Sequence, residues 1–117
     1  MTIAAIKRIE SQWYLPSYEE GKDSPSRFQF RTPTGAEMTQ ISDHFEYTEG
    51  GNFKLLSSGI DKCLKICLTG WEHVVDGDGK ELEFATKHLD YLPFWVRRDV
   101  AHHIVTKAYL SELEIKN

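Results

Sequence analysis

The sequence contains few cysteines, no block of basic residues and no long apolar run, and these absences exclude several classes of protein. Its apolar stretches are only a few residues long, whereas a membrane-spanning helix needs about 20 consecutive apolar residues. The N-terminal segment MTIAAIKRIE has an apolar start of four residues, shorter than a signal-peptide core, and no cleavage pattern follows it. We therefore expect neither a membrane partner nor export, and we predict a cytoplasmic protein.

Acidic residues slightly outnumber basic ones. The 14 lysines and arginines and the 18 aspartates and glutamates give a formal net charge of −4. Because no basic patch is present, a phosphate backbone would find no complementary surface, and a nucleic-acid partner is not expected. Hydrophobic residues at 40% and charged residues at 27% are typical of a soluble globular protein, and the length suits one compact domain over residues 1–117.

The two cysteines, Cys63 and Cys67, are four residues apart in an apolar helical pattern, which places both thiols on one helix face. A disulfide at this spacing within a helix would be badly strained. Free cysteine is among the most often buried residue types. We therefore interpret the pair as reduced core residues, and redox chemistry is the minor alternative.

The clearest helix signal is a set of apolar residues that recur at the spacing of one buried helix face. Ser58 with Asp61 resembles a capping box, and Gly70 suits the left-handed residue that often ends a helix. These features predict a helix over residues 59–69. The residues of the apolar stripe are Ile60, Cys63, Leu64, Cys67 and Leu68.

Further helices are predicted on both sides of this one. Residues 36–42 suit a short helix, Thr86 can cap another that runs to Tyr91, and Pro93 is typical of the first turn of a helix. A final helix follows, and its apolar residues occupy one side of the helical wheel. They are Val96, Val100, Ala101, Ile104, Val105 and Ala108.

Strand signals are fewer. Residues 27–31 alternate so that Phe28 and Phe30 share one face, which predicts a half-buried strand. In residues 71–84, two alternating runs flank Asp76-Gly77-Asp78-Gly79, a strong signal for a tight hairpin turn. This hairpin would place five residues on one face: Trp71, His73, Val75, Leu82 and Phe84.

The predicted fold class is α+β, predominantly helical, with a β-hairpin and a short N-terminal strand. Residues 17–26 and 47–52 are rich in turn-forming and polar residues, so we interpret both as flexible loops. The repeat of Ile3, Ile6 and Ile9 fits either a short helix or an extended segment.

No pattern in the sequence indicates catalysis, a cofactor or a metal. Five histidines are present, but the adjacent His102 and His103 point about 100° apart on a helix and cannot easily share one ion. Both are expected outside the apolar arc of the final helix. The acidic turn at residues 76–80 lacks the EF-hand glycine and glutamate positions. Because neither GxSxG nor a glycine-rich phosphate loop occurs, we predict no enzyme activity.

The chain is rich in aromatic residues, with three tryptophans, five tyrosines and six phenylalanines. Large aromatic side chains contribute either to cores or to protein interfaces. Those beside prolines or loops are the candidates for partner binding, and the edge of the predicted hairpin could add a strand to a partner. The candidate partner-binding residues are Trp13, Tyr14, Leu15, Phe94 and Trp95.

The second half of the chain, from about Leu55 to Asn117, contains an ordered series of residues: Gly70-Trp71-Glu72, Val74, Asp76, Asp78-Gly79-Lys80, Leu82, Phe84, Leu89, Leu92-Pro93 and Lys116-Asn117. In this order it resembles tail assembly chaperones of long-tailed phages and prophages, and a looser similarity covers Phe28 to Glu37. The resemblance implies an accessory protein in the cytoplasm of the infected host that binds the tape-measure protein and the tail-tube protein during tail assembly.

Two other functions are also compatible with the sequence. The protein could be a minor tail or decoration subunit that stays in the virion, or a small phage inhibitor of a host protein.

The net acidic charge also suits the chaperone function, because an acidic chaperone could mask apolar segments of a tape-measure protein while remaining soluble. The sequence leaves a homo-oligomer open.

Overall fold

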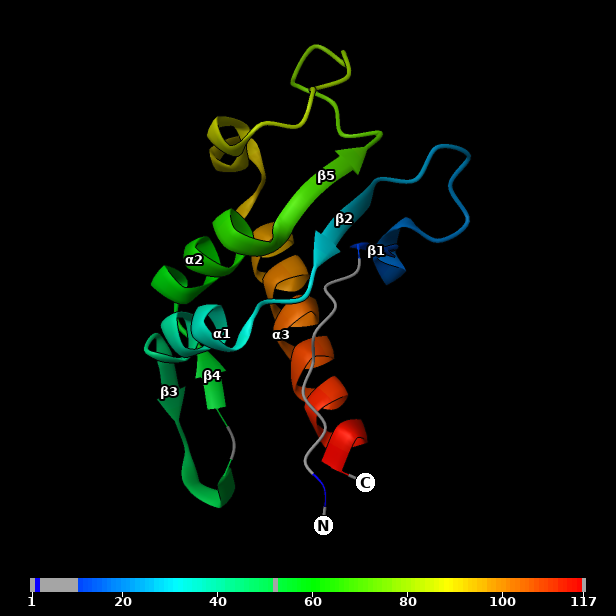
Figure 1. Ribbon diagram of the computed structural model, residues 1–117. Coiled ribbons are helices and arrows are strands. Elements are labelled where there is room, and N and C mark those ends of the chain that lie inside the picture. Colours follow the sequence, from blue (N-terminus) through cyan, green and yellow to red (C-terminus); the bar gives the residue numbers. More distant parts are fainter. Residues whose placement is uncertain (1, 3–10, 52, 117) are drawn as a thin grey trace.

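The computed structural model describes residues 2, 11–51 and 53–116, with side chains up to residue 109. The apolar repeat of Ile3, Ile6 and Ile9 lies outside the described residues. The chain has an α+β fold, as predicted, in which a small antiparallel sheet packs against helices (Figure 1). Among the described residues, no helix combines the length and the apolar character that are needed to span a bilayer.

A three-stranded antiparallel sheet lies at the centre, with strand order β1 (Ser11–Tyr14), β2 (Arg27–Arg31) and β5 (Leu68–Glu72). The predicted strand over residues 27–31 is confirmed as the central strand β2. Its two phenylalanines, Phe28 and Phe30, are buried on the same face because side chains alternate along a strand.

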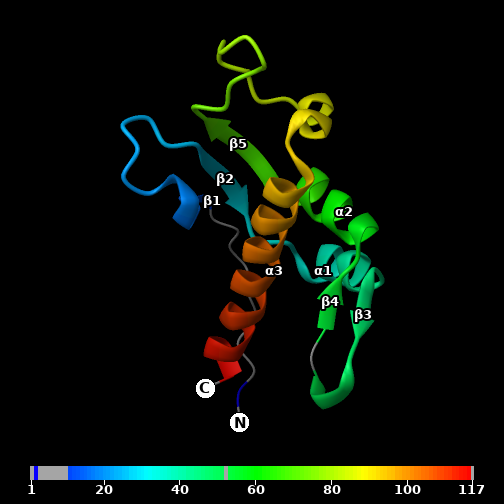
Figure 2. The ribbon, with the colours of Figure 1, turned by 180° about the vertical axis from the view of Figure 1, so that it is seen from behind.

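The helix α3 (Phe94–Lys116) runs along one side of the sheet and packs against α2 (Ser57–Cys67), as both ribbon views show (Figures 1 and 2). The short α1 (Gly35–Ser42) packs on α2. Both predicted apolar stripes are buried, which confirms the helical periodicity in these segments. Cys63 and Cys67 are free and buried within this core, as predicted.

A second, two-stranded sheet was not predicted. It consists of β3 (Phe45–Tyr47) and β4 (Phe53–Leu55), joined by a connection that contains the 3-10 turn η2 (Glu49–Gly51). Part of the segment 47–52, interpreted from the sequence as a loop, is therefore the connection of a β-hairpin. Strands of only three residues carry too little alternation to be recognised from the sequence.

Both predicted caps of the second helix are wrong. Leu56 occupies the N-cap position without a side-chain bond, and Ser58 instead lies 2.9 Å from the Nδ1 of His44 through its hydroxyl. The helix ends at Cys67, since Leu68 is already extended, and Gly70 belongs to β5. Pairing with β2 straightens this segment, and tertiary hydrogen bonds therefore override the local helix signal.

The predicted hairpin over residues 71–84 forms only at its tip. Val75 and Glu81 make an isolated bridge, and the Asp76 N–H donates to the carbonyl of Lys80 at 2.8 Å. The strand β5 pairs with β2 instead. His73 adopts a positive φ of 57°, which rotates the chain so that Val74 is buried and Val75 is 54% exposed.

The predicted common face of this hairpin is therefore wrong for His73 and Val75, which are exposed, whereas Leu82 and Phe84 pack against the core with Trp71 as predicted. Trp71 still contacts the returning segment: its ring packs edge-on against the Phe84 ring with centroids 5.0 Å apart, and its indole N–H donates to the Leu82 carbonyl at 2.7 Å.

The short helix before Pro93 is present as the 3-10 helix η3 (Thr86–Tyr91), but Ala85 rather than Thr86 occupies its N-cap.

Gly59 allows α2 to lie close to the turn after α1. A Cβ at this position would come within 2.5 Å of Leu55 Cδ1 and 2.9 Å of His44 Cβ. Alanine normally stabilises a helix relative to glycine, but here the steric conflict opposes that gain.

We predict that Gly59→Ala lowers the free energy of unfolding by about 1–3 kcal/mol in urea denaturation. Gly35→Ala, with open space around its Cβ, is the control and should be neutral or stabilising.

The N-terminus of α1 is held by a charged pair and a capping box. The two terminal guanidinium nitrogens of Arg31, Nη1 and Nη2, donate to the two oxygens of the Glu37 carboxylate, each at 2.7 Å. The Glu37 N–H donates to Thr34 Oγ1, and the Thr34 N–H donates back to the carboxylate. The bonds from Arg31 lower the pKa of Glu37 to about 2.

Because this pKa is lower in the folded state, the stabilisation is present above about pH 4.5 and is lost as the pH falls toward about 2. We predict that Glu37→Gln, which can keep the capping geometry, lowers the free energy of unfolding by about 2 kcal/mol at pH 7. The wild type and the variant should converge at acidic pH in urea titrations. An equal difference between them at pH 7 and pH 2 would contradict this assignment.

Candidate functional site

A cleft of about 680 Å³ opens at one end of the sheet. The strand order explains its position: β1 ends, β2 begins and β5 ends at the same end, because β2 is antiparallel to both neighbours. Residues 17–26 and 73–82 therefore emerge side by side, and residues 91–96 close the third side. Its lining includes the buried side chains of Phe28, Val74, Leu92 and Val96 and the exposed side chains of Tyr18, Val75, Tyr91 and Trp95.

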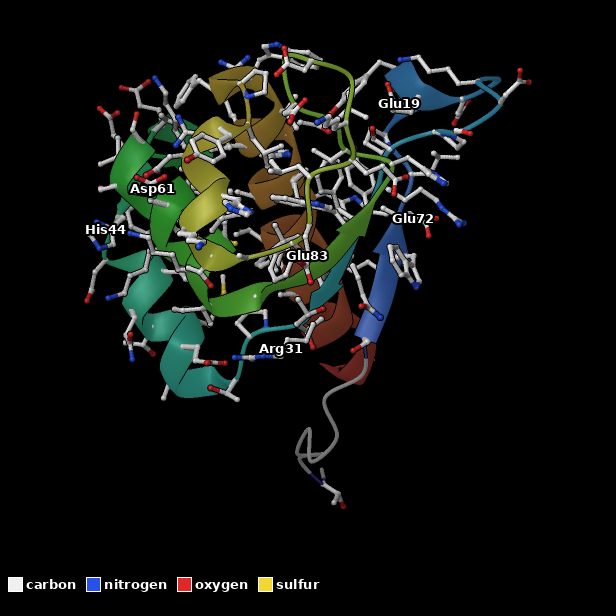
Figure 3. All side chains as sticks on the ribbon, turned by 90° about the horizontal axis from the view of Figure 1, so that it is seen from above. Glu19, Arg31, His44, Asp61, Glu72 and Glu83 are labelled. Carbon is white, nitrogen blue, oxygen red and sulfur yellow. The ribbon has the colours of Figure 1, made fainter. Side chains whose placement is uncertain are left out.

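Glu19 organises the first wall of the cleft. Although it belongs to the 3-10 turn η1 (Ser17–Glu19), its side chain is largely buried; Figure 3 labels it beside this turn. Its carboxylate accepts the Ser26 N–H at 2.8 Å and pairs with the Lys22 ammonium. These bonds, first that of Lys22, lower the pKa of Glu19.

Two hydrogen bonds tie this wall to the opposite one. The Ser26 hydroxyl donates to the His73 carbonyl at 2.7 Å, and His73 Nδ1 lies 3.0 Å from the Pro25 carbonyl. Since a carbonyl only accepts, the neutral His73 ring must carry its proton on Nδ1 to form this bond. The left-handed backbone of a non-glycine residue costs about 1–2 kcal/mol, and these bonds help to offset that cost.

Trp95 is the predicted partner-binding residue that lies in the cleft. It is 52% exposed at the start of α3, and its ring packs edge-on against Tyr18 with centroids 4.8 Å apart. Tyr18 was not predicted, since its segment was interpreted as a flexible loop. Nothing in its segment, residues 17–26 (SYEEGKDSPS), distinguishes Tyr18 from a solvent-exposed loop residue.

Tyr14 has a different place from the one predicted for a partner-binding residue. Its hydroxyl donates to the Asp99 carboxylate at 2.8 Å, and its ring stacks on the His103 ring with centroids 3.8 Å apart. Tyr14 therefore joins β1 to α3. Partial burial, and then the hydrogen bond and charge of Asp99, raise the pKa of Tyr14. His103 also contacts Phe30. The expectation that His103 lies outside the packed face is therefore wrong, and burial lowers its pKa.

The other three predicted residues are exposed but do not line the cleft. Trp13 projects on the opposite face of β1 from Tyr14, and the guanidinium carbon of Arg27 lies 5.6 Å from its ring centroid. Leu15 directly follows Tyr14 in the sequence. Phe94 lies beside the guanidinium groups of two arginines of α3.

A second aromatic surface, the hairpin face, belongs to the β3–β4 hairpin, which lies at the opposite end of the molecule from the segments before β2 and after β5 (Figures 1 and 2). The rings of Phe45 and Phe53 stack on one side of the β3–β4 hairpin with centroids 4.5 Å apart. Tyr47 lies on the same side, and its side chain is 70% exposed. Phe53 also approaches Tyr109 of α3. The hairpin face is defined by Phe45, Tyr47, Phe53 and Tyr109.

Within the described part of the chain, no group of three or more histidine, cysteine, aspartate or glutamate residues is arranged to hold a metal ion. No family model, curated protein or solved structure matches the chain. The cleft and the hairpin face are therefore the features from which a function can be proposed.

We predict that Glu19→Gln loosens the first wall of the cleft, because a neutral amide accepts the Ser26 N–H less strongly than a carboxylate does. The protection factor of the Ser26 amide should fall about fivefold in hydrogen exchange at pH 7. In the wild type, the same protection should be retained above about pH 4.5 and lost as Glu19 is protonated below it. Glu20→Gln, at an exposed neighbour, is the matched control, and an equal loss in that variant would contradict the role of Glu19.

Proposed function

We propose that the protein is a non-enzymatic assembly chaperone for the tails of long-tailed phages, which binds the tape-measure and tail-tube proteins in the host cytoplasm. The observation that carries this proposal is the cleft, where Trp95 and Tyr18 stand exposed above an apolar floor. Exposed tryptophan and tyrosine beside an apolar recess are the features from which interface hot spots are built. The resemblance in the second half of the sequence supports the same function.

The polar groups at the cleft support binding rather than catalysis. The Glu19 carboxylate is engaged by Lys22 and Ser26, and the His73 ring by a backbone carbonyl. Groups held in this way fix the shape of the walls. In this proposal the cleft provides a preformed apolar recess into which a partner inserts side chains.

Two separate surfaces would suit a protein with two partners. The segments that form the walls of the cleft and the β3–β4 hairpin lie at opposite ends of a molecule whose longest dimension is 55 Å (Figure 1). A chaperone could therefore hold a tape-measure segment at the cleft and leave the hairpin face free for a tail-tube subunit. We assign the tape-measure protein to the cleft because apolar segments need a recess more than a folded tube subunit does.

The test is co-expression with the tape-measure and tail-tube proteins of the same genome, followed by affinity purification. We expect the tape-measure protein to co-purify and to become insoluble when the chaperone is absent. Trp95→Ala should weaken this interaction about tenfold or more, whereas Trp13→Ala, at a similarly exposed tryptophan outside the cleft, should leave it unchanged. Urea unfolding of both variants checks that the fold is retained.

Three outcomes would contradict the proposal or part of it. Failure to bind either tail protein would remove the chaperone function and favour a host-directed inhibitor. Stoichiometric retention in purified virions, measured by mass spectrometry, would favour a structural tail protein. Loss of binding in Trp13→Ala alone would move the binding site from the cleft to the outer face of β1.

A further inference from the structure

The net charge of the protein is concentrated around the cleft. The two segments that form its facing walls, residues 17–26 and 73–82, together carry six carboxylates and two lysines, a balance of −4 that equals the charge of the whole chain. The remaining sequence contains 12 acidic and 12 basic residues and is neutral. The residues concerned are Glu19, Glu20, Asp23, Asp76, Asp78 and Glu81, with Lys22 and Lys80.

Part of this charge is used within the protein. Glu19 is neutralised by Lys22, and one oxygen of Asp76 accepts the N–H groups of Asp78 and Lys80 at 2.9 and 3.1 Å. These bonds shape the walls.

Four carboxylates remain exposed and make no ion pair with any described residue: Glu20, Asp23, Asp78 and Glu81. Asp78 follows Gly77 and Glu81 precedes Leu82, and both of these neighbours line the cleft. On the other wall, Glu20 follows Glu19 and Asp23 follows Lys22, and both of these neighbours also line the cleft, so carboxylates without an ion pair lie beside both walls.

The tertiary structure produces this concentration. The two acidic segments are about 50 residues apart in the sequence, and the antiparallel pairing of β2 and β5, in which Arg27 is opposite Glu72, brings them together. Like charges gathered at one site repel each other, and a bound cation would relieve that repulsion. An apolar floor beside the charges lowers the local dielectric and strengthens the attraction.

We propose that the cleft selects a peptide segment in which a large apolar side chain is flanked by lysines or arginines, and that it rejects an acidic segment of the same apolar pattern. The apolar side chain would enter the recess beside Trp95, and the cations would face the carboxylates of the two walls. This inference deepens the proposed function, because it specifies which segments of a tape-measure protein the cleft would take. It concerns the chemistry of the cleft and does not require that partner.

The test uses a synthetic probe rather than a tail protein. A fluorescein-labelled helical peptide of leucine and lysine, with its leucines on one face, is compared with a peptide in which every lysine is glutamate. A third peptide keeps the lysines and replaces the leucines by serine. Fluorescence anisotropy at low salt should show the leucine–lysine peptide binding at least about tenfold more tightly than either of the others, and added salt should weaken it.

Two double variants separate the cleft from general charge attraction. Asp78→Asn with Glu81→Gln removes two unpaired carboxylates beside the cleft. Glu46→Gln with Glu49→Gln removes two exposed carboxylates from the β3–β4 hairpin, so the net charge changes equally. We expect the first pair to weaken peptide binding about tenfold and to reduce its salt dependence, and the second to have little effect.

Each result bears on the inference. Equal weakening in both double variants would mean that only the overall charge attracts the peptide, and equal affinity for the lysine and glutamate peptides would remove charge selection. Binding of none of the peptides would overturn the inference. Peptide binding at the cleft without co-purification of the tape-measure protein would leave the inference standing and remove the proposed function, and the converse result would do the reverse.

Discussion

The burial of Phe28 and Phe30 on one face of β2 is the constraint on which the rest of the structure depends. These two rings pack with the apolar faces of α2 and α3, and the register of β2 must keep both of them on the core face, because a slip of one residue would turn them toward solvent. Pairing with β1 and β5 then determines where the connecting segments emerge. The cleft lies at that end of the sheet because the antiparallel arrangement brings three chain segments together there.

The polar contacts around the cleft have a consistent role in this arrangement. Tyr14, through Asp99 and His103, fastens the edge strand to α3, and Glu19 then holds the following segment over the recess. His73 ends β5 with a left-handed turn and is bonded to the facing wall. Such a site has walls formed before any partner arrives, which reduces the entropy lost on binding.

The asymmetry of charge gives the two ends of the molecule different binding properties. The walls of the cleft carry six carboxylates and two lysines, whereas residues 45–55 of the hairpin carry two carboxylates and one lysine, so the negative excess is smaller at the hairpin face, where Tyr47 and Tyr109 are exposed. A partner attracted by charge would therefore encounter the cleft, and a partner attracted mainly by apolar contact could use the hairpin face. This division fits an accessory protein that brings two other proteins together, as proposed above.

The sequence by itself determined the buried faces of the main helices and of β2, because periods of 3.6 and 2 residues follow directly from backbone geometry. It also predicted Trp95 as a partner-binding residue, and this exposed side chain lies in the cleft. The tertiary structure alone decided that residues 68–72 form a strand, that Tyr14 makes internal contacts, and that Tyr18 lies beside Trp95. These features depend on hydrogen bonds and ring contacts between distant segments, to which local patterns are insensitive. The concentration of carboxylates around the cleft could not be predicted from the sequence for the same reason, because the two acidic segments come together only when β2 and β5 pair.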